Sequence, residues 1–89
     1  METKLTPLYL KTASQKFDLQ TIIILDLSNR SVGRDLGSLP ECINLVHLNL
    51  SRNRIQLLTG IDKLTNLKIL DLSYNNLTTI DVIRGCLSL

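Results

Sequence analysis

Two cysteines and one histidine are the residues of this chain best suited to metal or nucleophilic chemistry: Cys42, Cys86 and His47. A zinc site needs three or four convergent ligands, and neither cysteine is spaced to join His47 in one. A catalytic site needs a nucleophile, a base and an oxyanion donor, and no serine is placed to pair with His47. The chain also has no glycine-rich phosphate loop. The sequence therefore predicts no enzyme, no metal site and no cofactor.

Composition and charge narrow the possible partners. Apolar residues make up 44% of the 89 residues but aromatic residues only 3%, so the core must be aliphatic. A net charge of +2 is too mild to indicate a nucleic-acid partner, and so few aromatic residues form no platform on which bases could stack. We therefore expect no direct binding to nucleic acid.

Neither a membrane span nor a signal peptide is evident. The longest purely apolar run, residues 22–25, falls far short of the roughly 20 residues that a membrane span needs. The N-terminal segment has neither an uninterrupted apolar stretch nor a small-residue cleavage site. The sequence predicts a chain that does not insert in membranes and is intracellular and cytoplasmic, with nuclear or ciliary locations left open.

A repeat of about 22 residues organises most of the chain. The segment LVHLNLSRNRI begins at Leu45 and LKILDLSYNNL begins at Leu67, an offset of 22. IIILDLSNRSV begins at Ile22, an offset of 23, with Arg30 where the other two segments have asparagine. All three fit the pattern L-x-x-L-x-L-x-x-N-x-L.

The second half of each repeat carries apolar residues at a spacing of three, which suits a 3₁₀-like or turn-rich segment better than an α-helix. These positions are 55, 58, 61, 64 and 67 in the middle repeat and 77, 80, 83, 86 and 89 in the last. The first repeat has one extra residue near 33–35, where we expect Gly33 to adopt a positive φ.

These motifs resemble leucine-rich repeats of the short intracellular class, similar to that of a phosphatase-1 regulatory subunit, over residues 22–89. The segments KFDLQTI and DLGSLPECINLVHLNLSRNRI are most similar to the leucine-rich repeat-containing protein 61 family. The resemblance implies an α/β fold: a right-handed solenoid with an N-terminal helical cap, three short parallel strands on the concave side and a 3₁₀ or irregular convex side.

The chain divides into a cap, residues 1–20, and three repeats within residues 21–89, at about 22–44, 45–66 and 67–88. Thr6 and Pro7 predict the start of a cap helix over about residues 7–16. One face of this helix is expected to cover the first repeat with Leu5, Leu8, Tyr9, Thr12, Ala13 and Phe17. The array stops at the start of a fourth repeat with no C-terminal cap, as in a fragment of a longer array, and the exposed edge there could self-associate.

Four residues are predicted to be structural. Cys42 and Cys86 both occupy the slot that Leu64 fills in the middle repeat, two repeats apart. At roughly 5 Å per coil they lie about 10 Å apart, too far for a disulfide, so both should be buried and reduced. Asn53 and Asn75 are expected to bond the backbone where the chain leaves each strand.

The Arg30 substitution has its own consequence for the first repeat. An arginine cannot bond the turn backbone as the asparagines do, so the first turn should be less regular. Asn29, one residue earlier, is a possible substitute.

The outward side chains of the strands remain for function. Alternation places them in three columns, which are the predicted partner-binding residues: Ile24, His47 and Ile69; Asp26, Asn49 and Asp71; and Asn29, Arg52 and Tyr74. Exposed isoleucines could reflect β-propensity alone, whereas the Arg52 and Tyr74 pair has the composition of interface hot spots.

We therefore expect a non-enzymatic protein–protein interaction module that binds a protein partner on its concave face. Two alternatives stay open at this stage. One is a scaffold in ribonucleoprotein assembly, since the cap segment resembles the lead-in of the spliceosomal A-prime protein. The other is a regulatory or ciliary-cytoskeletal adaptor subunit.

Overall fold

The computed structural model describes residues 2–77. The chain forms short elements joined by turns: α1 (Pro7–Ser14), η1 (Leu19–Thr21), β1 (Ile24–Asp26), β2 (Gly33–Arg34), η2 (Leu39–Glu41), β3 (His47–Asn49), β4 (Arg54–Ile55), η3 (Ile61–Lys63) and β5 (Ile69–Asp71). α1 is an α-helix, and the three η elements are 3₁₀-helices.

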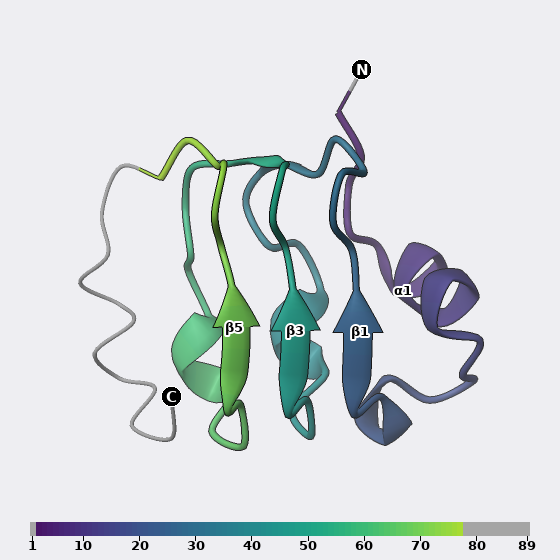
Figure 1. Ribbon diagram of the computed structural model, residues 1–89. Helices are drawn as coiled ribbons and strands as arrows, with labels where there is room; N and C mark the ends of the chain where they lie inside the picture. The colour runs from purple at the N-terminus through teal and green to yellow at the C-terminus, as the bar shows by residue number, and fades with distance from the viewer. Residues whose placement is uncertain (1, 78–89) are drawn as a thin grey trace.

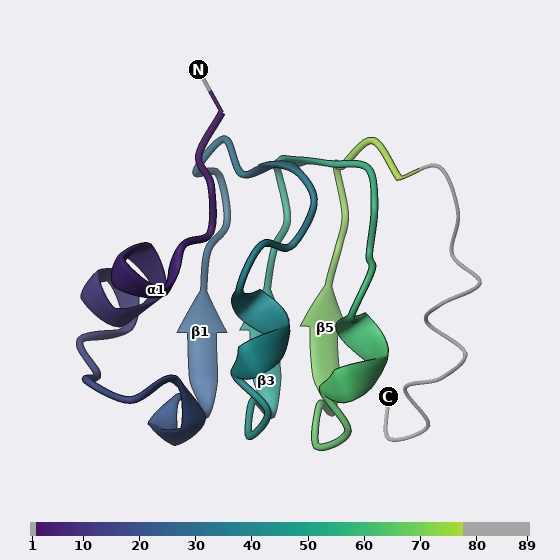
Figure 2. The same ribbon diagram turned by 180° about the vertical axis from the view of Figure 1, so that it is seen from behind.

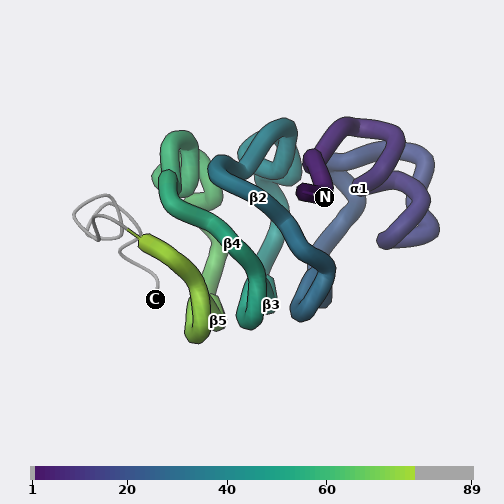
Figure 3. Tube along the Cα trace, turned by 90° about the horizontal axis from the view of Figure 1, so that it is seen from above, coloured from purple at the N-terminus to yellow at the C-terminus, as the bar shows by residue number. Residues whose placement is uncertain are grey.

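The strands stack in parallel, one from each repeat. β1, β3 and β5 form one sheet in that order, and the register aligns Ile24 with His47 and His47 with Ile69. Figure 1 shows this sheet from the front, with α1 beside β1. The 3₁₀-helices η2 and η3 lie behind it (Figure 2), and seen from above the successive coils stand side by side (Figure 3). The predicted solenoid of short parallel strands with one helix and 3₁₀ turns is confirmed.

A second ladder, which the sequence analysis did not predict, follows the turns. β2 and β4 pair in parallel, with Gly33 opposite Arg54 and Arg34 opposite Ile55. Strands of two residues are too short to produce a recognisable hydrophobic alternation. They form because the backbone leaving each turn runs alongside the same segment of the next coil.

The core is aliphatic and continuous. All apolar positions at the spacing of three between Ile55 and Leu67 are at most 2% exposed. The equivalent positions of the first repeat, from Val32 through Cys42 to Leu45, are equally buried. The equivalent positions after Leu77 lie outside the described residues.

Gly33 does not adopt the predicted positive φ. The glycine lies in β2, and the left-handed residues near it are Ser31, Arg34 and Gly37. A Cβ at Gly33 would overlap the outer atoms of the exposed Glu2 side chain, which can move aside, and the Gly33 N–H donates to the Thr3 carbonyl at 3.2 Å. The extra residue of the first repeat is absorbed by the neighbouring positions.

The cap helix starts as predicted and ends two residues early. Thr6 is the N-cap, and its Oγ1 accepts a hydrogen bond of 3.1 Å from the Tyr9 N–H. Pro7, which has no N–H to leave unpaired, occupies the first helical turn. Gln15 ends the helix with φ 60°, and its N–H donates to the Lys11 carbonyl.

The buried face of the cap agrees with the predicted one only in part: Leu5 is buried, and Tyr9 and Ala13 pack against the core. Leu10 is fully buried, whereas Leu8 is 75% exposed and Phe17 is 97% exposed. Leu5 and Leu10 stand at the N′ and N4 positions around the Thr6 N-cap, the spacing at which two apolar residues meet across the start of a helix. Burying this pair turns the helix so that Leu8 points away from the core.

Asn53 joins the turns of two successive coils. Its Nδ2 donates to the Leu27 and Leu50 carbonyls, both at 2.9 Å, and to the Ser51 carbonyl at 3.2 Å. Its Oδ1 accepts from the N–H groups of Arg30 and Val32, both at 3.0 Å. One side chain therefore satisfies backbone groups of its own turn and of the turn before it.

Asn75 repeats this arrangement one coil later. Its Nδ2 donates to the Leu50 carbonyl at 2.8 Å and the Leu72 carbonyl at 3.0 Å, and its Oδ1 accepts from the Ile55 N–H. The two asparagines thus perform, in the described residues, the backbone-bonding role expected of them.

The first turn, which has Arg30 in this slot, is held from the N-terminal side. Thr3 donates its N–H to the Ser31 carbonyl at 2.8 Å and its hydroxyl to the Arg30 carbonyl at 2.7 Å. Among residues 2–77, Thr3 and Asn53 make the hydrogen bonds to the backbone of this turn, and the Asn29 side chain does not replace them. Ser31 has a left-handed φ of 57° that its counterpart in the next repeat, Arg54, does not share, so this turn is less regular than the second.

Replacement of Asn53 by Ala tests the importance of this bridge. The variant leaves buried carbonyl and N–H groups of two turns without partners, and we expect a loss of about 3 kcal/mol in the free energy of unfolding. Urea denaturation followed by circular dichroism measures it. The control is Asn76→Ala, at an exposed asparagine. Equal stability of the two variants would contradict the role of Asn53.

Candidate protein-binding surface

The first predicted column is an apolar lane interrupted by a histidine. The sheet register places Ile24, His47 and Ile69 in a line across the three strands. Ile24 is 69% exposed and Ile69 is 54% exposed, and His47 is exposed between them. Side chains on one sheet face at strand spacing form a continuous surface, so this lane offers apolar area together with one hydrogen-bonding ring.

The second column is occupied by contacts within the chain. Asp26 Oδ1 accepts from the Ser28 N–H at 2.9 Å and from the Ser28 hydroxyl at 2.7 Å. Asp71 makes the same two bonds with Ser73 at 3.0 and 2.7 Å. In the middle repeat Asn49 Oδ1 accepts from the Ser51 N–H at 2.9 Å. These oxygens hold the start of each turn, a function that the sequence analysis did not assign to them.

The serine bonds also set the acidity of the two carboxyl groups. The Ser28 hydroxyl, followed by the Ser28 N–H, lowers the pKa of Asp26 below its ordinary value of 3.8. Ser73 lowers the pKa of Asp71 in the same way, with a smaller contribution from Arg52. Hydrogen bonds to the charged form are the cause in both cases, because each favours the carboxylate over the acid.

The repeated triplets Asp-Leu-Ser and Asn-Leu-Ser could have revealed this second role from the sequence. An Asp or Asn side chain readily bonds a backbone N–H two residues later. The alternation of the strand, which the analysis used instead, gives only the direction of the side chain.

The third column lies where each strand passes into its turn, and all three of its residues are left-handed. Asn29, Arg52 and Tyr74 have φ values of 54°, 58° and 57°. An asparagine tolerates this region, whereas a residue with a longer side chain is less favourable there by roughly 1 kcal/mol. Asn29 and Arg52 donate their N–H groups to the Ser51 and Ser73 carbonyls of the next coil, both at 2.9 Å, which holds them in this conformation.

Arg52 and Tyr74 are in direct contact. The Arg52 guanidinium carbon lies 4.5 Å from the centre of the Tyr74 ring, within cation–π range. Tyr74 is 72% exposed and Arg52 is exposed. Each side chain restricts the rotamers of the other, so the pair presents a flat, partly ordered surface beside the strands.

The structure therefore brings the nine predicted residues together on one face but divides their roles. The first and third columns keep their side chains available to a partner. In the second column the Oδ1 atoms already accept hydrogen bonds within the chain, so only the other side-chain atoms can contact a partner. Within residues 2–77 no group of His, Cys, Asp and Glu side chains could hold a metal ion.

Cys42 lies away from this face, in the core. Its thiol is free and its side chain is fully buried. Burial, followed by the nearby Glu41 carboxylate, raises the pKa of Cys42 from 9.0 to about 11. A protonated, enclosed thiol is neither nucleophile nor metal ligand, which fits the structural role expected of Cys42. Cys86 lies outside the described residues.

None of the helices in the described part of the chain is both long and apolar enough to cross a membrane.

Comparison with known proteins is consistent with this architecture. Residues 43–85 match the family described as leucine-rich repeats, in two copies. The chain is also similar to the crystal structure of an internalin from Listeria monocytogenes strain 4b F2365, with a TM-score of 0.81 and 22% sequence identity. The match covers 93% of this chain and 27% of the internalin chain, so the chain spans about a quarter of that structure. The fold is a leucine-rich-repeat solenoid.

Replacement of both carboxylates by amides tests the second column. A carboxyl group with a lowered folded-state pKa stabilises the protein above its ordinary pKa, and this contribution is lost as pH falls through the folded value. We expect Asp26→Asn/Asp71→Asn to keep the turns, as Asn49 does, and to lose less stability than the wild type as pH falls below about 4. Urea midpoints at neutral and acidic pH measure the difference. The matched control is Asp62→Asn, on an exposed aspartate of η3; an unchanged acid profile in the double variant would exclude the proposed effect.

The reactivity of Cys42 provides a second test. In a Cys86→Ser variant we expect Cys42 to resist a thiol reagent at neutral pH and to react fully in urea. Its raised pKa also predicts that stability falls as pH rises from about 9 towards 11, because the unfolded chain loses the thiol proton first. A Cys42→Ala variant should lack that part of the alkaline decline. Rapid labelling of the folded chain would contradict the buried position.

Proposed function

We propose that this chain is a non-enzymatic, intracellular protein-interaction module that binds a protein partner on the concave face of its sheet. Leucine-rich-repeat domains generally mediate protein–protein interaction. Repeat solenoids offer an extended curved face for this purpose. The residues proposed to contact the partner are those of the first and third columns: Ile24, His47, Ile69, Asn29, Arg52 and Tyr74.

The Arg52–Tyr74 stack is the observation that carries this proposal. Both residues occupy left-handed backbone positions where Asn or Gly would be less strained. Neither side chain contributes to the core, since both are exposed. Strained conformations persist where surrounding structure determines them, and they cluster at functional sites. A partner contact is a reason to retain a large cationic and a large aromatic side chain there.

The apolar lane supports the same face. Ile24 and Ile69 leave more than half of their surfaces in water, and covering them would be favourable by about 25 cal/mol per Å² of apolar area. Interface centres combine such aliphatic area with aromatic residues and arginine. The lane lies on the strands and the Arg52–Tyr74 stack lies just beyond the ends of β3 and β5, so a single partner segment could cover both.

The position of this chain among leucine-rich-repeat proteins is a further part of the proposal. We infer that it belongs with the short intracellular class, nearest to the leucine-rich repeat-containing protein 61 family. The repeat length of 22 to 23 residues and the segments KFDLQTI and DLGSLPECINLVHLNLSRNRI support this placement.

The double variant Arg52→Asn/Tyr74→Asn tests the binding face. Asparagine is the residue that the first repeat has at this position, so we expect a melting temperature equal to or above that of the wild type. The wild-type chain and the variant are then compared by affinity capture from cells and quantitative mass spectrometry. Partners of the concave face should be lost from the variant by at least about tenfold.

The control for this comparison is Leu57→Ser, which removes a half-exposed apolar side chain outside the three columns. This control should retain the captured proteins. Capture that is unchanged by the double variant, with both proteins folded, would rule out the concave face as the binding surface.

A further inference from the structure

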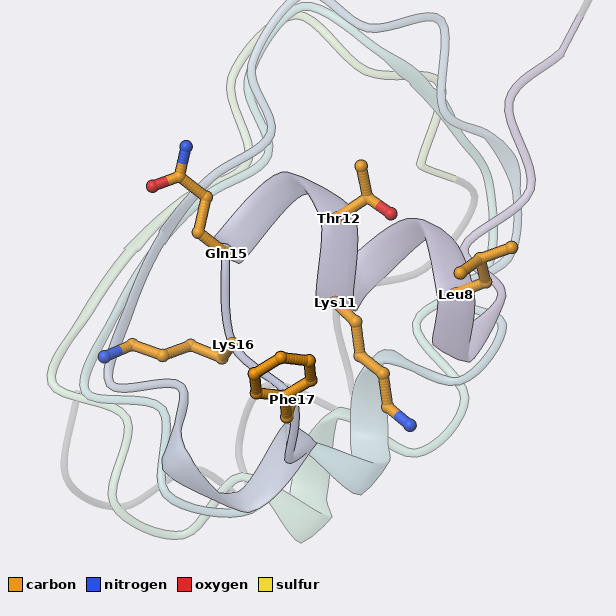
Figure 4. Close-up of a pocket in the computed structure, with 6 residues that line it drawn as sticks. All are labelled: Leu8, Lys11, Thr12, Gln15, Lys16 and Phe17. Carbon is orange, nitrogen blue, oxygen red and sulfur yellow. The ribbon is translucent and has the colours of Figure 1, made fainter.

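A second surface lies on the outer side of the N-terminal cap, away from the sheet. A hollow of about 350 Å³ is lined by Leu8, Lys11, Thr12, Gln15, Lys16 and Phe17. Figure 4 shows Leu8 at one end of α1, Gln15 at the other, and Phe17 below the helix between Lys16 and Lys11. Its accessible lining is largely apolar, although it faces solvent.

The backbone of the cap explains why two large apolar side chains are exposed there. The Leu5 and Leu10 pair fixes the buried side of α1, which leaves Leu8 on the outer side. At the other end Gln15 is left-handed, and both its N–H and that of Lys16 donate to the Lys11 carbonyl. This tight ending, rather than a continued helix, positions Phe17 at the rim of the hollow.

The exposure of Phe17 is unusual for its residue type. A phenylalanine buries 150–250 Å² in a typical core or interface, yet here it is 97% exposed. Leu8 shares the same hollow and is 75% exposed. Two neighbouring apolar side chains bordering a concave surface form a patch suited to one inserted side chain.

The charged residues that line this hollow are of one sign. Lys11 and Lys16 line the hollow, and no acidic residue does. In Figure 4 their ammonium groups extend to opposite sides of the Phe17 ring. Asp18 and Glu41 line an adjoining hollow beyond Phe17 and Lys11. A segment seated in the first hollow therefore meets two ammonium groups and no carboxylate among its lining residues, and a partner that bears negative charge complements this lining.

We propose that this hollow binds an acidic segment of a partner protein. An aliphatic or aromatic side chain of that segment inserts between Leu8 and Phe17, and flanking carboxylates pair with Lys11 and Lys16. The site is separate from the sheet face, so one chain can hold two partner segments at once.

The number of lysines favours an acidic peptide over an anionic membrane. Lipid recognition by electrostatics uses clusters of about four to eight Lys or Arg residues, whereas this hollow has two. A second copy of the chain is also disfavoured. In a symmetric dimer the same patch would meet itself, and its lysines would face lysines.

Selection from a random-sequence phage-displayed peptide library on the full 89-residue chain tests the proposal. The Phe17→Ser variant serves for counter-selection, and its unaltered melting temperature is expected because the side chain is exposed. We expect the enriched peptides to carry an aliphatic or aromatic residue flanked by Asp or Glu. In nitrogen-15 spectra the best peptide should shift the amide signals around Lys11 and Phe17.

Charge variants separate the lysine contacts from a general effect of charge. We expect Lys11→Glu/Lys16→Glu to weaken the selected peptide by at least about tenfold. Lys63→Glu/Lys68→Glu changes net charge by the same amount at exposed positions elsewhere and should leave binding within about twofold.

Four results would overturn the proposal. The first is no enrichment over the Phe17→Ser protein, and the second is enrichment of basic peptides. The third is equal loss of binding in both charge variants. The fourth is amide shifts confined to Arg52 and Tyr74, which would place the peptide on the sheet face. The last result would support the concave-face function, so the two proposals fail independently.

Two further measurements test whether the hollow instead binds a lipid surface or a second copy of the chain. Cosedimentation with phosphatidylserine-containing vesicles that depends on Lys11 and Lys16, without peptide enrichment, would identify a lipid and overturn the proposal. A dimer in analytical ultracentrifugation that Phe17→Ser dissociates would identify a second copy, with the same consequence. Neither is expected.

Discussion

The hydrogen bonding of buried turn backbone by asparagine is the interaction on which the rest of this structure depends. A chain that reverses at the end of every short strand leaves carbonyl and N–H groups pointing inward, where water cannot reach them. Asn53 is 7% exposed and has both donors and an acceptor to offer to two turns at once. Unpaired, such groups would each cost about 1–3 kcal/mol, an appreciable part of the stability of a small domain.

This bonding also fixes the positions from which the surface side chains project. Once the turn amides are held, the residue that precedes Asn53 or Asn75 must be left-handed, whatever its type. Arg52 and Tyr74 therefore stand at one height on adjacent coils, which is why their side chains can stack. The same repetition aligns Ile24 with Ile69 across the sheet. The geometry of the proposed binding face is thus a consequence of the repeat and not of separate loops.

The first coil of a solenoid differs from the inner coils, because no preceding coil bonds its turn or covers its core side. At the N-terminal end Thr3 supplies bonds that an asparagine ladder would provide further along, and α1 covers the first coil with Leu10. The outer side of α1 does not cover a coil. Leu8 and Phe17 are exposed there, so core packing does not determine which charged residues surround them.

Features of the fold that depend on neighbouring residues in the sequence could be predicted, and features that depend on distant residues could not. The spacing of Leu45, Leu48 and Leu50 fixed the strand and its buried side, because alternation depends only on the local backbone. Thr6 and Pro7 located the start of the cap helix for the same reason. The face of that helix was only partly right: Leu5, Tyr9 and Ala13 pack on the core as predicted. Leu10 is buried in place of Leu8, because the two are equally apolar and only the shape of the first coil chooses between them. Gly33 was also misjudged, since its backbone pairs with Arg54 and bonds Thr3, both far away in sequence.

By itself the sequence determined the repeat, the aliphatic core, the asparagine positions and the outward columns, all of which arise from periodic choices made residue by residue. Only the tertiary structure decided that Arg52 stacks on Tyr74 and that Phe17 lies exposed beside two lysines. Each of these depends on how turns and coils come together in space. The physical reason is that the repeat pattern predicts whether a side chain points inward or outward. Which side chains touch also depends on where the turns and coils lie in space.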